Sequence, residues 1–455
     1  MIEAGNPRAM DRDIRRKMLV IALPVVANNL IETLYNLVDA FFLGKLGTAE
    51  ISAPSISFSI MLFLIVFGTG ISGAGTTLIA QAKGRGDQAK ANFYMNQTAT
   101  FLFFLSLFLM VIGLALSRPL LALLGTPPEV FGYTLVFMRI SFIGVPFMFA
   151  YYVLLSSFTA VGDSFTALWV HLIGIGVNVI LDPFLIYGLG PFPRLGVAGA
   201  AIATVFSQVI VAVLSVIILT QGRHGLRLSL EAMKPRREAI RLLTGIGLPS
   251  SLGQAISSLG FTVLQGLVNG FGASAIAAFG VGNRITGLFD IPARGIANAA
   301  TALAGQALGV GDEARSRRIV RISLIACVAF MTPLLAAAFF FGGDLVRFFV
   351  NDAEAIRLGD IMFKVTTPSV LLFGLYLVIT GAFQGAGATR VIMVLSIVRL
   401  WVLRVPLAYA LAAFTSLGPL SIWYAMFVSN AGTALAGFIH YKGGRWLKAL
   451  EGRKI

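Results

Sequence analysis

Long apolar segments alternate with short polar ones along almost the whole chain. A helix needs roughly 20 mostly apolar residues to cross the ~30 Å hydrocarbon layer of a membrane, and each apolar segment is long enough to do so. The segments comprise residues 17–43, 52–80, 94–117, 130–156, 164–188, 196–220, 240–266, 275–308, 319–343, 356–384, 391–412 and 417–441. The pattern predicts an all-α, polytopic membrane protein with twelve transmembrane helices.

Composition agrees with this prediction and excludes several classes of protein. Hydrophobic residues make up 57% and charged residues 12% of the 455 positions, whereas about a quarter of an ordinary globular chain is charged. That leaves no room for a large domain outside the membrane and excludes a soluble enzyme. Basic cytoplasmic loops explain the net charge of +15 better than nucleic-acid binding does, so we expect no nucleic-acid partner.

The basic residues also predict the orientation of the chain. If the N-terminus is cytoplasmic, 24 of the 35 Lys and Arg residues lie in cytoplasmic segments and five in the outer loops. Lys and Arg concentrate on the cytoplasmic side of membrane proteins. We therefore expect a multi-pass protein of the cell (inner) membrane with both termini in the cytoplasm.

The second half of the chain repeats the first at a constant offset of 225 residues. Leu23-Pro24 corresponds to Leu248-Pro249, and residues 75–87 correspond to 300–312. Six helices per half is an even number, so the two halves share one orientation and are related by an axis along the membrane normal. We expect an N-terminal lobe at 1–220 with helices 1–6, a basic cytoplasmic linker at 221–241 and a C-terminal lobe at 242–455 with helices 7–12. Two pseudo-symmetric lobes are typical of alternating-access transporters.

Two acidic residues, Asp39 and Asp182, lie inside spanning helices, where a charge costs a few kcal/mol and marks a candidate functional site. Each lies about one turn before the outer end of its helix, so both are at the same depth. Asn178 shares the face of Asp182, and Tyr35 shares that of Asp39, because four residues separate each pair. Thr204, on the sixth helix, reaches a similar depth.

These side chains suit a small cation. Carboxylate, amide and hydroxyl oxygens replace the water around Na⁺, and two close carboxylates can instead hold one proton between them. We predict an ion-coupling site, and a candidate Na⁺ site, formed by Asp39, Asn178, Asp182 and Thr204, with H⁺ or Na⁺ as the ion and no other cofactor. The alternative is that both acids only cap helix ends at the wet edge of the membrane.

Two further residues of the first helix, Glu32 and Pro24, each allow a functional and a structural interpretation. Glu32 could line a cavity for a cationic substrate together with Tyr35 and Asn178, or it could equally pair with a buried arginine such as Arg139. Pro24 removes a backbone hydrogen bond, so it is either a hinge or a passive kink.

The second half of the chain does not copy the two acids. Leu264 stands at the position of Asp39, and Val405 stands at that of Asp182 when the following prolines are aligned. This asymmetry predicts that the N-terminal lobe alone handles the ion.

The second half has charges of its own. Oppositely charged residues four apart predict two neutralised structural pairs, Asp290 with Arg294 and Asp360 with Lys364. The pattern assigns no role to Arg284, Arg399 or Arg404.

Motifs of other protein classes are missing from the sequence. There is no P-loop, which excludes ATP-driven transport by this chain, and the three histidines are too scattered for a metal site. An intramembrane enzyme, such as a prenyl or acyl transferase, would need a paired-acid metal motif or a histidine-based catalytic set. We therefore expect a transporter and not an enzyme.

The sequence resembles the multidrug and toxic compound extrusion (MATE) family, within it the DinF-like prokaryotic branch. The resemblance covers essentially the whole chain. Besides the repeat, it rests on residues 24–53, 81–87 and 158–163, and most specifically on Asn178-x-x-x-Asp-Pro-x-x-Ile-Tyr-Gly188 followed by residues 195–204.

The resemblance implies a multidrug efflux antiporter that exports bulky, often cationic amphiphiles in exchange for inward H⁺ or Na⁺ and confers antibiotic resistance. Asp39 and Asp182 resemble the coupling carboxylates of the family, Asn178 their amide partner and Pro24 the proline at which the first helix bends. For one further position of the family site, Thr204 and Ala200 compete. The expected partners are small-molecule drugs or toxins and the lipid bilayer, and a self-contained two-lobe chain is expected to be a monomer.

A lipid or lipid-linked oligosaccharide flippase of the same superfamily is the main alternative. Such a protein would face its cavity with several arginines for phosphates, and Arg139, Arg284 and Arg294 could serve. The acids at positions 32, 39 and 182 instead predict an acidic N-terminal lobe, which favours the antiporter.

Overall fold

The structure, a computed structural model, describes residues 7–450, except for the side chains of residues 48 and 49. The described residues contain no strand and form twelve helical segments of 24 residues or more. These segments are α1 (Pro7–Gly44), α2 (Thr48–Gly84), α3 (Gln88–Leu123), α4 (Pro128–Val161), α5 (Ser164–Tyr187), α6 (Val197–Thr220), α7 (Arg237–Asn269), α8 (Ala273–Gly309), α9 (Glu313–Phe340), α11 (Ala353–Gly385), the broken helix Thr389–Phe414 and α14 (Leu420–Gly443). The predicted all-α fold with twelve long helices is confirmed.

Ten of the twelve segments are long and apolar enough to cross a membrane, judged within the described residues. The other two are α7 and α8. Polar residues interrupt the apolar stretch of α7, and Arg284, Asp290 and Arg294 interrupt that of α8. Short helices complete the chain: α10 (Gly342–Arg347), η1 (Arg223–Gly225), η2 (Leu230–Met233) and η4 (Arg445–Lys448).

The eleventh apolar segment is not one regular helix. It begins as α12 (Thr389–Ile397), continues as the π-helical stretch η3 (Val398–Arg404) and ends as α13 (Val405–Phe414). The corresponding helix of the first half, α5, contains no such stretch. A π-helix is rare and is frequently found at functional sites.

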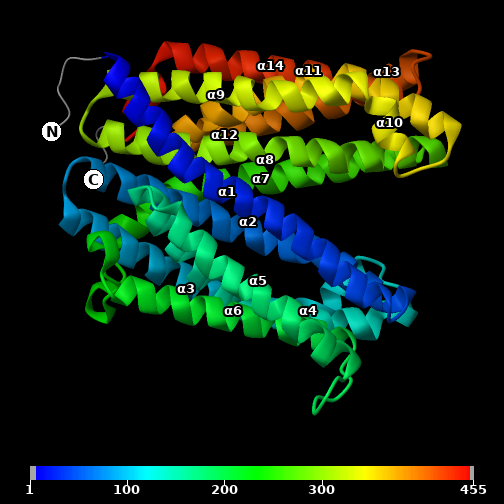
Figure 1. The fold of residues 1–455 in the computed structure, drawn as a ribbon, viewed down its shortest axis with the longest axis horizontal. Coiled ribbons are helices and arrows are strands. Elements are labelled where there is room, and N and C mark those ends of the chain that lie inside the picture. Colours follow the sequence, from blue (N-terminus) through cyan, green and yellow to red (C-terminus); the bar gives the residue numbers. More distant parts are fainter. Residues whose placement is uncertain (1–6, 451–455) are drawn as a thin grey trace. The chain divides into compact units, whose positions relative to one another are not determined.

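The internal repeat is visible in the packing of each half. In the first half α4 packs against α2, α3 and α6, and in the second half α11 packs against the corresponding helices α8, α9 and α14. A buried hydrogen bond repeats at the offset of 225 residues: the Thr76 hydroxyl donates to the Ser156 carbonyl at 3.3 Å, and the Thr301 hydroxyl donates to the Gly381 carbonyl at 2.8 Å. Figure 1 shows α8, α9, α11 and α14 running along one another.

The chain divides into two compact units. One unit contains residues 27–248, and the other contains residues 7–26 together with 249–450. We call them the first unit and the second unit. The sequence grouped residues 1–26 with the first lobe, whereas the structure places the described part of this segment in the second unit. α1 and α7 each pass from one unit into the other within three residues of a proline, Pro24 or Pro249.

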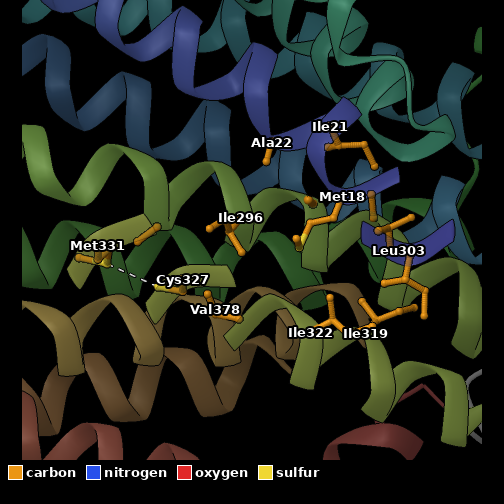
Figure 2. Packing of buried hydrophobic residues seen from close by; sticks show 14 of the residues in the cluster. Met18, Ile21, Ala22, Ile296, Leu303, Ile319, Ile322, Cys327, Met331 and Val378 are labelled. Atoms are coloured by element: carbon orange, nitrogen blue, oxygen red, sulfur yellow. Dashed lines mark hydrogen bonds between the residues drawn. The ribbon is translucent and has the colours of Figure 1, made fainter. Parts of the chain in front are cut away.

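Hydrophobic packing explains why the start of α1 belongs to the second unit. Met18, Ile21 and Ala22 are buried in a cluster with residues of α8, α9 and α11, among them Ile296 and Ile319. Figure 2 shows these side chains meeting in one core. At its polar end, Asp11 of α1 forms a salt bridge with Arg318 of α9 at 2.5 Å. α1 therefore begins well before the apolar segment at 17–43.

The expected basic linker is ordered and is held against α3 by hydrogen bonds. The amide of Asn96 donates to the Arg227 carbonyl at 3.0 Å and accepts from the Ser229 backbone N–H at 2.9 Å. Gln97 likewise donates to the Lys234 carbonyl at 2.8 Å and accepts from the Arg236 backbone N–H at 2.8 Å. These bonds satisfy backbone groups of a segment that has little secondary structure of its own.

Candidate functional site

Asn178 is the centre of a polar cluster in the first unit. It is 2% exposed on α5, four residues before Asp182, which is fully buried. When the amide is oriented so that donors face acceptors, its nitrogen lies 2.9 Å from Oδ2 of Asp182 and 3.1 Å from the Tyr35 hydroxyl. Its oxygen lies 2.9 Å from the backbone nitrogen of Thr204 and 3.3 Å from the Thr204 hydroxyl. One amide thus connects α1, α5 and α6.

Asp39 lies beside this cluster on α1, four residues after Tyr35. It is half-buried and close enough to Asp182 for the two charges to interact. The first unit therefore brings together Tyr35, Asp39, Asn178, Asp182 and Thr204, the set that the equal depths and four-residue spacings predict.

Each of the two acids has one oxygen without a hydrogen-bond partner. Oδ1 of Asp39 and Oδ1 of Asp182 are buried, and neither has a partner among the described residues. A buried polar atom left in this way costs free energy, and two bare carboxylates so close together repel each other. A proton or a cation with oxygen ligands removes both penalties. The arrangement is therefore suited to binding H⁺ or Na⁺.

A helix-capping role does not explain Asp182. The end of α5 is closed by Gly188, which adopts a left-handed conformation with φ of 75° and donates its N–H to the Phe184 carbonyl. Asp182 lies inside the helix and is 0% exposed, so it is not at a wet edge. Nearby, the Tyr187 hydroxyl donates to the Phe42 carbonyl at 2.7 Å and ties the end of α5 to α1.

The repeat supports the closeness of the two acids independently. Leu264 and Val405, their counterparts in the second unit, belong to a single hydrophobic cluster that also contains Leu400. Leu264 is only 1% exposed. The same two positions thus belong to one polar group in the first half and to one hydrophobic cluster in the second.

A second polar group lies at the deeper end of the first unit's part of α1, and the sequence did not predict it. Nδ1 of His171 lies 2.6 Å from Oδ1 of Asn28, and the His171 ring stacks on Tyr151 with 5.0 Å between ring centroids. Glu32 is exposed and close enough to Tyr151 and Tyr152 for electrostatic interaction. The signal in the sequence was a histidine and two adjacent tyrosines inside apolar segments.

The proposed structural partner of Glu32 is elsewhere. Nε of Arg139 donates to the Ser117 hydroxyl at 3.1 Å, and within residues 7–450 no salt bridge joins Arg139 to Glu32. The pairing of Glu32 with Arg139 is therefore wrong. An exposed carboxylate beside two tyrosine rings is instead suited to attracting a cation.

Of the two structural ion pairs predicted in the second half, only one forms. Lys364 lies 2.7 Å from Asp360. Asp290 and Arg294 form no salt bridge in the described part of the chain, because the Arg294 side chain is exposed whereas Oδ1 of Asp290 is buried without a hydrogen-bond partner. The prediction for this second pair is wrong.

Comparison with known proteins adds the family. The MatE family model matches residues 24–184 and again 249–410, two matches whose starts are 225 residues apart. A protein of Bacillus subtilis named probable multidrug resistance protein YoeA is 29% identical over 412 residues, which cover 90% of this chain and 89% of that protein. A Shewanella oneidensis protein named FAD transporter is 26% identical and covers 87% of each chain.

The fold also agrees with solved structures. A structure titled "Crystal structure of MATE in the bent conformation" superposes with a TM-score of 0.90 at 23% identity, and the match covers 98% of this chain and 99% of the other. Together with the two family-model matches, which span both halves, this agreement shows that the chain belongs to the MatE family, whose members are membrane transporters and not enzymes.

Proposed function

We propose that the protein is a secondary active multidrug exporter that moves cationic amphiphiles outward in exchange for inward H⁺ or Na⁺. The observation that carries the proposal is the pair of buried, unpartnered carboxylate oxygens of Asp39 and Asp182 beside Asn178. Several curated relatives are named multidrug export or resistance proteins, which supports the class of cargo. The relative named FAD transporter widens the range of cargo to be tested.

In this mechanism the ion and the cargo compete for the acidic residues of the first unit. When Asp39 and Asp182 are bare, the negative charge of these two acids and of Glu32 favours a bound cation. When H⁺ or Na⁺ neutralises the two acids, that attraction weakens and the cargo leaves. Such competition is a reciprocal coupling between two ligands, and it requires a conformation that each ligand favours differently.

Pro24 is the proposed hinge for the conformational change. It leaves the carbonyl of residue 20 without its helical hydrogen bond, which lowers the resistance of α1 to bending. The chain passes from one compact unit into the other two residues later. A bend at this point changes the direction of the part of α1 that carries Tyr35 and Asp39.

The distribution of Lys and Arg supports an orientation with both termini in the cytoplasm, and thus inward-directed ion gradients as the driving force. The proposed location is the inner (cell) membrane, and the proposed functional form is a monomer. A lipid flippase is less well supported, because Asp39 and Asp182 would then face each other without an ion to bind.

Efflux of ethidium from proteoliposomes tests the proposal. Efflux is measured under an imposed pH gradient and, separately, under an imposed sodium gradient, so the gradient that drives it identifies the coupling ion. Asp39→Asn and Asp182→Asn are expected to abolish gradient-driven efflux. Glu129→Gln, which removes an exposed acid in the first turn of α4, is the matched control and is expected to leave efflux unchanged. Wild-type efflux in both Asp variants would refute the proposal.

A further inference from the structure

We propose that the second unit carries an anion-binding site, formed by Arg294 and Arg399 near Asp290, that takes the phosphate group of an amphiphilic molecule. The proposal rests on an excess of positive charge inside the helices of this unit. Asp290 interacts electrostatically with three arginines, Arg294, Arg399 and Arg404. Three guanidinium groups and one carboxylate leave two positive charges without a counterion in the described part of this unit.

The π-helical stretch η3 brings two of these arginines to one face. Arg399 and Arg404 are five residues apart, and in an α-helix they would point about 140° away from each other. A π-helix bonds residues five apart and winds less tightly than an α-helix, so here the two side chains lie closer to one face than they would in an α-helix. The corresponding helix of the first unit, α5, contains no arginine: with the prolines aligned, Gly176 stands at the position of Arg399 and Leu181 at that of Arg404.

Arg404 has enough partners of its own to be a structural residue. It is 1% exposed, its Nε donates to the Ser429 hydroxyl at 2.8 Å and its guanidinium donates to Oδ1 of Asn430 at 2.5 Å. Asn430 in turn donates to the Ser369 hydroxyl at 3.2 Å. These bonds connect η3 with α14 and α11 and hold the π-helical stretch in place, but all of them are to neutral groups.

Arg399 has no such set of partners. Its guanidinium lies over the Phe373 ring at 4.5 Å from the centroid and 5.8 Å from that of Tyr376. The side chain is 6% exposed, yet its Nε is buried without a hydrogen-bond partner in the described structure. A guanidinium stacked on a ring keeps its donors in the plane of the group, which is the geometry that binds phosphate or carboxylate oxygens.

Arg294 gives the cluster access from outside. It lies near the middle of α8, roughly 30 Å along the helix from its first residue, and it is exposed without a salt bridge among residues 7–450. An arginine at this depth faces water or a polar ligand and not hydrocarbon, because an exposed charge in lipid is too costly. Exposure thus decreases from Arg294, which is exposed, through Asp290, which is half-buried, to Arg399, which is buried.

The neighbouring rings indicate what the rest of the ligand is like. Phe373 and Tyr376 stack on each other with 5.9 Å between centroids, and apolar helices surround them. A ligand with a phosphate next to an aromatic or apolar body matches both parts of this environment. A phosphate-bearing cargo and a phospholipid headgroup share this chemistry.

Equilibrium binding of a matched pair of probes tests the site. Riboflavin and riboflavin 5′-phosphate share one ring system and differ by a phosphate, and both report binding to the purified, delipidated protein through flavin fluorescence. We expect the wild type to bind the phosphate form at least about tenfold more tightly, as a charge-assisted contact predicts. Arg294→Gln and Arg399→Gln should each remove this preference and leave the Kd for riboflavin unchanged.

Two further variants keep the test conclusive. Arg284→Gln removes an exposed arginine of α8 outside the cluster and should keep the preference. Arg399→Lys retains the charge and should restore part of it, which a merely structural loss would not do. Equal binding of the two flavins by the wild type, or full preference in both Arg294→Gln and Arg399→Gln, would overturn the proposal.

Adding phosphatidylglycerol distinguishes the two sources of phosphate. Competition with riboflavin 5′-phosphate in the wild type, absent in Arg294→Gln, would identify a lipid headgroup as an occupant of the same site. No competition would identify a soluble or amphiphilic cargo. The inference rests on the proposed function only in treating that ligand as cargo, because binding is measured without transport. If the wild type shows no preference for riboflavin 5′-phosphate but exports ethidium, the site alone is refuted. If the wild type shows the preference but no gradient-driven ethidium efflux, the proposed function alone is refuted.

Discussion

Replacing Asp39 by leucine is predicted to make the protein more stable and to abolish its coupling. Leucine is the residue that the repeat places at the equivalent position, Leu264. Oδ1 of Asp39 is buried without a hydrogen-bond partner among the described residues, so the substitution removes a penalty and breaks no hydrogen bond of the Asp39 side chain.

The expected gain follows from that orphaned atom. A buried, unsatisfied polar group costs about 1–3 kcal/mol. At roughly 2–4 °C per kcal/mol for a unit of this size, the variant should unfold about 2–12 °C above the wild type. The comparison is made in sodium-free buffer at high pH, because a bound ion would stabilise the wild type by mass action and hide the difference.

The reverse substitution is the matched control. Leu264→Asp places a carboxylate in a packed cluster with Leu400 and Ala408 and should destabilise the protein by at least about 3 kcal/mol. Unfolding in detergent is followed by tryptophan fluorescence, and ethidium efflux is measured on the same preparations. The reasoning is refuted if Asp39→Leu unfolds at a lower temperature than the wild type, or if it retains gradient-driven efflux.

Three further predictions concern other parts of the molecule. Pro24→Ala restores a helical hydrogen bond and should reduce ethidium efflux several-fold while ion binding to the purified protein is retained; unchanged efflux would argue against the hinge. Thr301→Val removes the buried hydrogen bond to the Gly381 carbonyl and should destabilise the protein by about 1 kcal/mol. Thr76→Val removes the equivalent bond of the first half and should cost about the same, and thermal unfolding of both variants shows whether the two losses of stability agree. Burial raises the pKa of Asp163 at the start of α5, but hydrogen bonds from Thr166 and His224 outweigh it and lower this pKa from its usual value, so the stability from Asp163 is complete above about pH 4 and lost at lower pH. Asp163→Asn should therefore flatten the loss of stability below about pH 4, and an unchanged slope in chemical unfolding would contradict this.

The cluster around Asn178 could be predicted because two simple rules coincide there. Residues four apart share a helix face, which pairs Tyr35 with Asp39 and Asn178 with Asp182. Helices of known direction and similar length bring residues at equal distances from their ends to one depth. These rules determine which residues meet, whereas their roles in ion coupling remain a proposal.

Contacts that depend on the rotation of helices about their axes could not be predicted in this way. The contact of Asn28 with His171 requires one face of α1 to meet one face of α5, and no spacing within either helix indicates which faces meet. The pair Asp290 and Arg294 shows the same limit, because four-residue spacing allows a salt bridge but each side chain still adopts the rotamer favoured by its surroundings.

Neither the broken helix nor the unit boundaries could be predicted from the sequence. Residues 391–412 form an uninterrupted apolar segment, and a π-helical stretch has no hydrophobic period of its own at this length. The start of α1 is a polar N-terminal segment in the sequence, and its place in the second unit depends on contacts with α8, α9 and α11, among them the salt bridge of Asp11 with Arg318 more than 300 positions later in the chain. Long-range pairs of this kind follow from packing and not from local pattern.

Ion release on cargo binding tests the central claim most directly. Purified protein in weakly buffered detergent solution is mixed with ethidium, and released H⁺ and Na⁺ are measured with a pH indicator and a sodium electrode. If the acids of the first unit exchange ion for cargo, the wild type releases one of these ions in proportion to the ethidium bound, and Asp39→Asn/Asp182→Asn releases neither. Equal release from the double variant, or ethidium binding by the wild type without any release, would contradict the account.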